Sequence, residues 1–334
     1  AHWLDTQVIL WDAPDGVETI KLHYSAAADL ETSVEDGLNG TAIELTPTTL
    51  TEEQIAIAPH LASIAAYEGD WSADDAKAVL KTQVVAAGYA SDGTLLAATR
   101  LQHANVLDQL YTQGEDDADE AMLGGVYTDD GITAAVWAPT ATTVNLLVYN
   151  DNKTLADRHA MTLNTESGVW VYNGDMSLDR KLYRYEVTVY HPSLDDITTL
   201  EVTDPYSVSL STNGRFSRFV NLADESLKPD GWDTQVIPEI ENPEDAVIYE
   251  GHVRDFSIRD MSTSEANRGK YLAFTEQGSD PVSHLQELAD AGLTHFHILP
   301  SNDIATIDED PANTVDIYDT VARLCVKRPN AQVC

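Results

Sequence analysis

The stretch from Val247 to Ile307 decides the fold of the last part of this chain. It opens with VIYEGHV at Val247–Val253 and reaches THFHILP at Thr294–Pro300 after a helical segment. Both runs are short, apolar and rich in β-branched or aromatic residues, which is typical of buried strands. A strand, a helix and a second strand in this order predict a parallel pair joined by a crossover.

The helix between these strands has clear start and stop signals. Ser279 or Asp280 can cap it, and Pro281 occupies the first helical position, where its missing N–H costs nothing. Gly292 suits the left-handed conformation just past the end. An apolar stripe at helical spacing runs along one face, through Val282, Leu285, Leu288 and Ala289.

This strand–helix–strand pattern predicts the opening of a (β/α)8 barrel. Eight such repeats need roughly 250 residues, and the stretch from Val247 to Cys334 is far shorter. We therefore expect residues 247–334 to form an incomplete barrel with unpaired sheet edges, and the remainder of the barrel to be its partner, as a continuation or a co-purifying fragment.

Composition excludes several classes of function. The 334 residues include 56 acidic and 19 basic side chains, which give a formal net charge of −37. This charge repels nucleic acid and anionic membrane surfaces, but an uncharged glycan is indifferent to it. Solubility or adaptation to a salty medium accounts for the acidity. No run approaches the roughly 20 apolar residues of a membrane span.

The chain contains two cysteines, Cys325 and Cys334. We expect a local disulfide between them, as a secreted protein would form. The spacing alone also allows a reduced pair or a partner beyond the chain. Two thiols without nearby histidines do not suggest a zinc site.

Turn residues and charge divide the chain into modules. We predict a β-rich module at 1–112, an acidic linker at 113–125, a β-sandwich at 126–222, a Pro-rich linker at 223–246 and the barrel segment at 247–334. The β-rich module shows apolar strand-like runs at Val8–Trp11, Thr19–Tyr24 and Ala42–Leu45, a short helix at Asp74–Leu80 and a hairpin over Val84–Arg100.

The sandwich shows strand signals at intervals that are typical of two packed antiparallel sheets. In Leu182–Tyr190 the side chains of Tyr183 and Tyr185 share one face with Val187, while Arg184 and Glu186 lie on the other. This alternation predicts a half-buried strand. The other predicted strands are Ile132–Trp137, Val144–Tyr149, Val169–Tyr172 and Ile197–Val202.

Motifs in a fixed order along the chain resemble bacterial secreted pullulanases, which are debranching enzymes of the α-amylase superfamily. The WAPTA motif at Trp137–Ala141 and VTDPY at Val202–Tyr206 resemble the starch-binding-type sandwich that precedes the barrel in these enzymes. The remaining similar segments are Ala1–Trp3, His60–Ser63, Tyr249–Ser257, Arg268–Thr275, Gly292–Pro300 and Asp303–Thr306.

The resemblance implies hydrolysis of α-1,6-glucosidic linkages in pullulan, amylopectin and limit dextrins by a retaining mechanism. Such chemistry needs a carboxylate nucleophile and a protonated carboxylic acid about 5 Å apart. In the family both groups lie on later barrel strands, so we assign no catalytic residue and expect this chain alone to be inactive. The resemblance also implies secretion or cell-surface location, and it allows calcium in the parent enzyme, although we assign no cofactor or metal to this chain.

Three residues are our candidates for substrate binding. Glycan modules stack sugar rings on exposed aromatic faces, so Trp170 and Tyr172 are candidates, while alternation favours a core position for Trp137. Asp303 follows the second barrel strand and is the third candidate. The family usually has Pro-Val-Phe-Asp there, whereas this chain has PSND at Pro300–Asp303.

Two further pairs of residues have side chains that could take part in chemistry, but we expect structural roles for them. Arg254 and Asp255 follow a strand end, where barrel enzymes place functional groups, but we expect structural hydrogen bonds there. His295 and His297 share a strand face without a third metal ligand, so we expect core histidines. The alternative to a hydrolase fragment is a non-catalytic α-glucan-binding or interaction protein.

Overall fold

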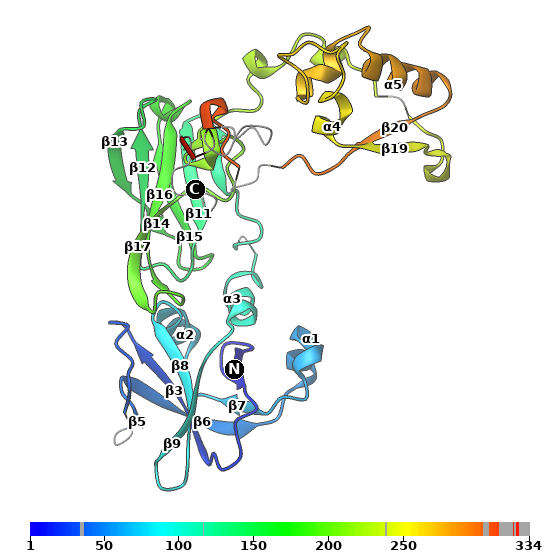
Figure 1. Cartoon of the computed structure of the whole chain (residues 1–334). Helices are drawn as coiled ribbons and strands as arrows, with labels where there is room; N and C mark the ends of the chain where they lie inside the picture. The colour runs from blue at the N-terminus through cyan, green and yellow to red at the C-terminus, as the bar shows by residue number, and fades with distance from the viewer. Residues whose placement is uncertain are drawn as a thin grey trace. The chain divides into compact units, whose positions relative to one another are not determined.

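The computed structural model describes residues 1–33, 37–115, 117–237, 239–302, 307–313, 323 and 325–326. The chain forms two compact units, Ala1–Asn221 and Leu222–Cys334. Figure 1 shows the elements of each unit. The first unit contains the β-rich module and the sandwich, and the second contains the strand–helix–strand segment.

The β-rich module is built on an antiparallel sheet whose described strands follow the order β1-β2-β7-β6-β3-β8-β9. The strands predicted near residues 8, 19 and 42, the helix near 74 and the hairpin ending at Arg100 are all confirmed. The strands are β1 (His2–Trp3), β2 (Val8–Leu10), β3 (Thr19–Ser25), β6 (Thr41–Thr48), β7 (Ala66–Glu68), β8 (Gln83–Tyr89) and β9 (Leu95–Arg100), with a small pair β4 (Thr32–Ser33) and β5 (Gly37–Leu38) beside them. The helices are α1 (Glu52–Ile57), α2 (Ala73–Val79) and α3 (Ala104–Tyr111).

Two tryptophans anchor the core of this module. Trp3 and Trp71 are buried and meet edge to face, with ring centroids 5.7 Å apart. The Trp71 indole N–H also donates to the carbonyl of Thr6, so the ring is fixed at both its apolar and its polar side. Gly69 lies so close to Trp71 that a Cβ at this position would overlap the indole ring.

A buried histidine of β3 joins β8 and the segment between β5 and β6. His23 Nδ1 lies 2.9 Å from the Asn39 carbonyl oxygen, and Nε2 lies 2.8 Å from the Tyr89 hydroxyl. Since a carbonyl accepts only, Nδ1 carries the proton and Nε2 accepts from the tyrosine. Burial is the main cause that lowers the pKa of His23. Burial therefore favours the neutral ring in the folded module.

We expect the β-rich module to lose stability as the pH falls below about 6.5, the ordinary pKa of histidine. The unfolded chain then binds a proton that folded His23 resists, and a depressed pKa makes the stability rise with pH in this window. Urea unfolding at pH 7.5 and 5.0 measures the effect, and His23→Gln should weaken the pH dependence. A residual dependence is expected because burial also lowers the pKa of His103.

The sandwich consists of two antiparallel sheets. The first has the order β10-β11-β15-β14, and the second has the order β13-β12-β16-β17 with β18 paired to β16. All five strands predicted from the sequence are confirmed. The strands are β10 (Gly124–Thr128), β11 (Gly131–Trp137), β12 (Thr143–Tyr149), β13 (Leu155–Ala160), β14 (Thr162–Leu163), β15 (Val169–Gly174), β16 (Leu182–His191), β17 (Asp196–Val202) and β18 (Ser217–Arg218).

The sandwich core surrounds a buried carboxylate. Tyr183 and Tyr185 face inward, as the alternation in β16 predicts, and both hydroxyls donate to Asp204 Oδ2, at 2.6 and 3.3 Å. Asp204 is only 4% exposed, and its Oδ1 accepts from the Tyr206 N–H at 2.8 Å. Phe219 stacks on Tyr183 with ring centroids 3.9 Å apart. Asp204 thus holds the inward tyrosines in place.

The second unit contains the predicted parallel pair. β19 (Ile248–Gly251) and β20 (His295–Ile298) pair in parallel, with Ile248 opposite His295 and Gly251 opposite Ile298. Between them lie α4 (Val253–Ser257) and α5 (Asp280–Asp290). Pro281 is the second residue of α5, one position later than predicted, and Gly292 adopts φ +109° beyond its end, as predicted. This pair is the only part of a barrel that the described residues form, so a TIM barrel as such is not established by this fold.

The first predicted strand of this unit ends earlier than expected. We predicted a strand through Val253, but Val253 begins α4. The cause is local, because His252 Nδ1 accepts from the Arg254 N–H and caps the helix. Ser279 precedes α5 as predicted, although its buried Oγ has no hydrogen-bond partner among the described residues.

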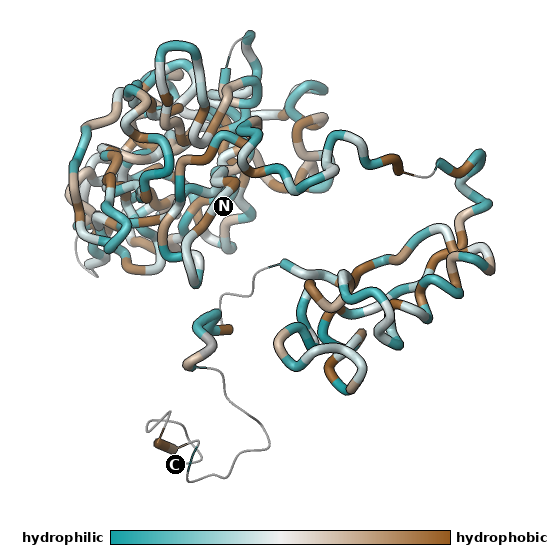
Figure 2. Tube along the Cα trace, turned by 90° about the horizontal axis from the view of Figure 1, so that it is seen from above, coloured by the Kyte–Doolittle hydropathy of each residue, from teal (hydrophilic) through white to brown (hydrophobic). Residues whose placement is uncertain are grey.

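Hydrophobic side chains are exposed in the segment that leads into β19. Trp232 is 63% exposed, and Val236 and Ile237 are also exposed. The hydrophobic colour of this segment can be followed in Figure 2.

Among the described residues, no helix combines the length and the apolar character that crossing a membrane requires.

Candidate functional site

The sandwich strand β15 carries two of the three predicted substrate-binding residues. Trp170 and Tyr172 alternate with Val169 and Val171, so both point toward the space between the two sheets. Their surroundings differ. Trp170 lies in the core, whereas Tyr172 lies at the margin of the core.

Trp170 has no ring face available for a sugar. It is 7% exposed, and its indole N–H donates to the Ala138 carbonyl at 3.0 Å. A stacking platform needs an exposed aromatic face. Trp170 therefore packs the sandwich core, and this position does not support its predicted contact with substrate.

Tyr172 is half-buried and stacks on His159 of the opposite sheet, with ring centroids 4.4 Å apart and an interplanar angle of 25°. It also lines a groove of about 420 Å³ together with Thr162 and Asn173. Its place at the open edge of the sandwich is compatible with the predicted role in sugar binding.

The prediction of a core position for Trp137 is wrong. Its neighbours Val136 and Ala134 point into the core, so Trp137 lies on the outer side of its sheet with Ala135 and Thr133. It is half-buried there, and its indole N–H donates to the Ser167 carbonyl at 3.0 Å. Sequence alternation identified the strand but not which of its two faces meets the second sheet.

The outer face of the second sheet is occupied by polar side chains that pair with one another. Arg184 Nη1 and the Tyr149 hydroxyl both contact Glu201 Oε2, each at 3.1 Å. Glu186 Oε1 accepts from Asn145 Nδ2 at 3.0 Å and from Arg158. The two glutamates thus pair within the protein, whereas Arg184 Nε is buried without a partner among the described residues.

The second unit brings His297 and Glu250 together across the parallel pair. His297 Nδ1 lies 3.2 Å from Glu250 Oε2, while His295 Nδ1 contacts the Thr294 hydroxyl at 2.8 Å. Both histidines are exposed in this structure, so the predicted core position is wrong for the described residues. Among these residues, no three or more His, Cys, Asp or Glu side chains gather in an arrangement suited to a metal ion.

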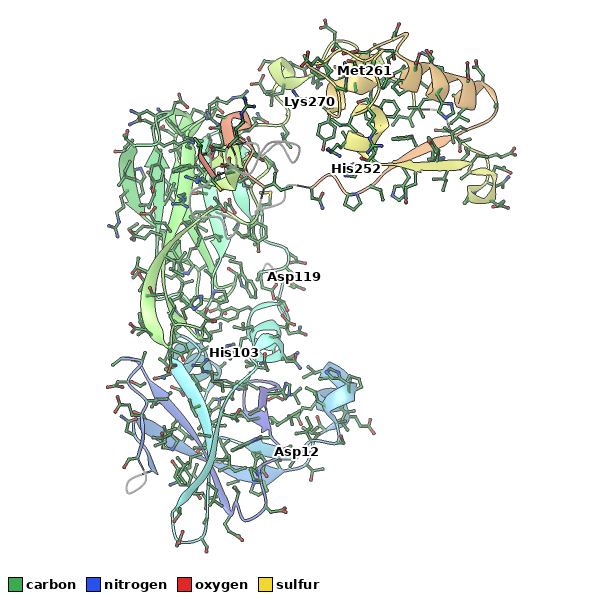
Figure 3. All side chains as sticks on the ribbon, viewed as in Figure 1. Asp12, His103, Asp119, His252, Met261 and Lys270 are labelled. Carbon is green, nitrogen blue, oxygen red and sulfur yellow. The ribbon has the colours of Figure 1, made fainter. Side chains whose placement is uncertain are left out.

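His252, labelled in Figure 3, lies between β19 and α4. Its side chain caps α4, as described above, and it lines a cavity of about 220 Å³ with Tyr249 and Phe296. Arg254 and Asp255 form an exposed pair, with Nη1 and Oδ1 3.7 Å apart. His252 thus makes a structural contact, whereas the side-chain hydrogen bonds that we expected for Arg254 and Asp255 are not seen among the described residues.

Two of the predicted sites fall outside the described residues. Asp303 lies outside them, so its contact with substrate stays a prediction. Cys334 also lies outside them, and the disulfide between Cys325 and Cys334 stays a prediction for the same reason.

Family models match both modules of the first unit. Residues 1–109 match the Pullulanase N2 domain, and residues 122–207 match carbohydrate-binding module 48, also described as the isoamylase N-terminal domain. The chain therefore carries an N2 domain followed by a carbohydrate-binding module.

Relatives and solved structures extend this match through the second unit. A pullulanase from Klebsiella pneumoniae is 38% identical over 97% of this chain and 30% of its own length, and pullulanase 1 of Arabidopsis thaliana is 34% identical over 94% of the chain and 32% of its own. The crystal structure of PulA from Klebsiella oxytoca has a TM-score of 0.91 at 37% identity, with 98% of this chain and 31% of that chain covered.

The chain therefore matches the N-terminal region of pullulanases. The chain spans about a third of the length of the relatives that it matches. What it shares with them is therefore the pair of accessory modules and the strand–helix–strand segment that follows.

Proposed function

We propose that this chain is the N-terminal part of a pullulanase-type glycoside hydrolase that cleaves α-1,6-glucosidic linkages in pullulan, amylopectin and limit dextrins. The observation that carries the proposal is the identity to a Klebsiella pneumoniae pullulanase over 97% of the chain, across both modules and the second unit. The reaction is retaining, and its two carboxylates lie on barrel strands beyond the residues of this chain.

The exposed strands of the second unit support a larger barrel. Ile248 is 61% exposed, and Tyr249 and Ile298 are exposed as well. Parallel sheets normally have both faces covered and both edges paired. We infer that β19 and β20 belong to a (β/α)8 barrel, and that its remaining strands pair with their free edges and cover these side chains.

A chimera tests the hydrolase proposal. This chain replaces the matching N-terminal region of the Klebsiella pneumoniae pullulanase, and the product is assayed for release of reducing ends from pullulan. We expect the chimera to cleave pullulan and the chain alone to release no sugar above background. A folded, soluble chimera without activity would contradict the proposal.

The carbohydrate-binding module supports a second candidate function, an α-glucan-binding protein without catalysis. In that case the chain alone binds pullulan in an affinity gel while the chimera stays inactive. The proposal also includes a secreted or cell-surface location, a disulfide between Cys325 and Cys334, and a parent enzyme that is able to bind calcium.

A further inference from the structure

The outer face of the β10-β11-β15-β14 sheet has an unusual arrangement of side chains. The strand register places Thr133 beside Asn173 and Ala135 beside Val171, with Thr162 of β14 opposite Val171. Directly paired residues point to the same face of a sheet. Ala135 and Val171 thus form a small apolar strip. The hydroxyl groups of Thr133 and Thr162 and the amide of Asn173 border it.

Two adjoining hollows lie along this face. One of about 280 Å³ is bounded by the sheet and by the segment that contains Asp117 and Met122, and the other, of about 420 Å³, surrounds the short strand β14. They share Asn164 and Val171. We name the two together the β14–β15 groove. Small-molecule sites occupy roughly 300–1,000 Å³, so the larger hollow lies within this range and the smaller lies just below it.

The amide and hydroxyl groups along the groove keep unused donors. Asn173 Oδ1 accepts from the Thr133 hydroxyl at 2.9 Å, and Asn164 Oδ1 accepts from the Glu166 N–H at 3.0 Å. Neither Nδ2 group donates to another described residue, and neither does the Thr162 hydroxyl. These exposed donors are free for a ligand.

At the end of the groove near Asp117, the group without a partner in the described part of the chain is an acceptor, not a donor. Asp117 is 7% exposed, and its Oδ2 accepts from the Gly114 N–H. Its buried Oδ1 has no hydrogen-bond donor among the described groups. Asp119, labelled in Figure 3, interacts with the same carboxylate, and this contact raises the pKa of Asp119. These two neighbouring carboxylates repel anions, and Asp117 Oδ1 lacks a donor although Asp119 hydrogen-bonds to the Asp117 side chain.

A ligand that fits this groove donates a hydrogen bond near Asp117 and accepts hydrogen bonds from the amide and hydroxyl groups at the other end. It also carries no negative charge. Sugar hydroxyls do both, and the apolar face of a pyranose fits the strip around Val171. Among the described lining residues, Asp117 and Glu120 are the charged ones. On the outer face of the opposite sheet, Glu186 and Glu201 already accept hydrogen bonds from Asn145 and Arg184, and Arg184 Nε is buried without a partner among the described residues.

We propose that the β14–β15 groove binds a segment of a neutral α-glucan and is a sugar site of the carbohydrate-binding module. The proposal rests on the glucan-directed function proposed above and assigns it to a defined surface. The groove is separate from the Glu201 cluster on the other sheet.

Calorimetric titration of the full chain with maltoheptaose tests the assignment. Thr162→Trp places a large ring in the groove at an exposed edge position, and we expect affinity to fall at least tenfold. Asn173→Ala removes one donor, and we expect a loss of about two- to tenfold. Affinity should not change between 50 and 500 mM salt, because the ligand is neutral.

Thr199→Trp is the matched control, since Thr199 is an exposed threonine on β17 in the opposite sheet. Circular dichroism of each variant checks that it is folded. If Thr199→Trp abolishes binding while folded Thr162→Trp binds as well as the wild type, the groove assignment is wrong and glucan binding stands. If the wild-type chain itself does not bind maltoheptaose, the groove proposal and glucan binding by this chain both fail, whereas the chimera assay still decides the hydrolase proposal.

Discussion

Replacing Asp204 by alanine is expected to lower the free energy of unfolding of the sandwich by about 3 kcal/mol. The change removes the acceptor of the Tyr183 and Tyr185 hydroxyls and of the Tyr206 N–H. Two buried tyrosine hydroxyls then lose their partner, and an unsatisfied buried donor costs about 1–3 kcal/mol. Urea unfolding followed through the Trp170 indole N–H signal measures the loss in this module.

The destabilisation by Asp204→Ala at different pH values separates the effect of Asp204 protonation from the effect of lost packing. Burial has the largest effect on the pKa of Asp204 and raises it. Hydrogen bonds from the Tyr183 hydroxyl and the Tyr206 N–H lower this pKa and act against the effect of burial. The folded protein thus binds this proton more tightly than the unfolded chain, so the contribution of Asp204 is complete below about pH 3.9 and declines as the pH rises through its folded pKa. The destabilisation by Asp204→Ala should therefore be larger at pH 4 than at pH 7. A constant difference across this range would contradict the raised pKa.

Replacing Gly69 by alanine is expected to destabilise the β-rich module by about 3 kcal/mol. The added Cβ overlaps three ring carbons of Trp71, so the indole must leave its place against Trp3. Displacement also breaks the hydrogen bond to the Thr6 carbonyl. A shift of the Trp71 indole N–H signal and an earlier urea midpoint are the expected observations.

Gly93→Ala is the control for this prediction. Gly93 has φ +88° in the β8–β9 turn, and no atom lies within 4 Å of its added Cβ. Alanine there meets only the strain of the left-handed conformation, which costs about 1 kcal/mol. Equal losses for the two variants would show that contact with Trp71 is not the cause.

The sequence was sufficient to predict most strands because their signals are local. The β8–β9 hairpin follows from Ser91-Asp92-Gly93, and the inward face of β16 follows from the alternation of Tyr183 and Tyr185 with polar residues. The parallel pair follows from the capped helix between two apolar runs. In each case a turn residue or a simple period determines the result.

The errors arise where distant contacts decide. Trp137 and Trp170 lie in equally apolar strands, and only the position of the second sheet determines that Trp170 is buried. The error at Val253 has a local cause instead, because the His252 side chain caps a helix that starts at this strand-forming residue. The β14–β15 groove was missed because its residues are ordinary asparagines and threonines whose register alone brings them together.

The short parallel pair has a consequence for the order of events during synthesis. In the first unit the main sheets are built from antiparallel strands that all lie before residue 221, so both modules can reach their final packing as soon as that length has left the ribosome. β19 must wait for β20, more than forty residues later, to gain its first strand partner. Until more of the sheet has formed, the unpaired backbone groups of β19 can pair with strands of other chains. During this time β19 is attached to two domains that have already folded.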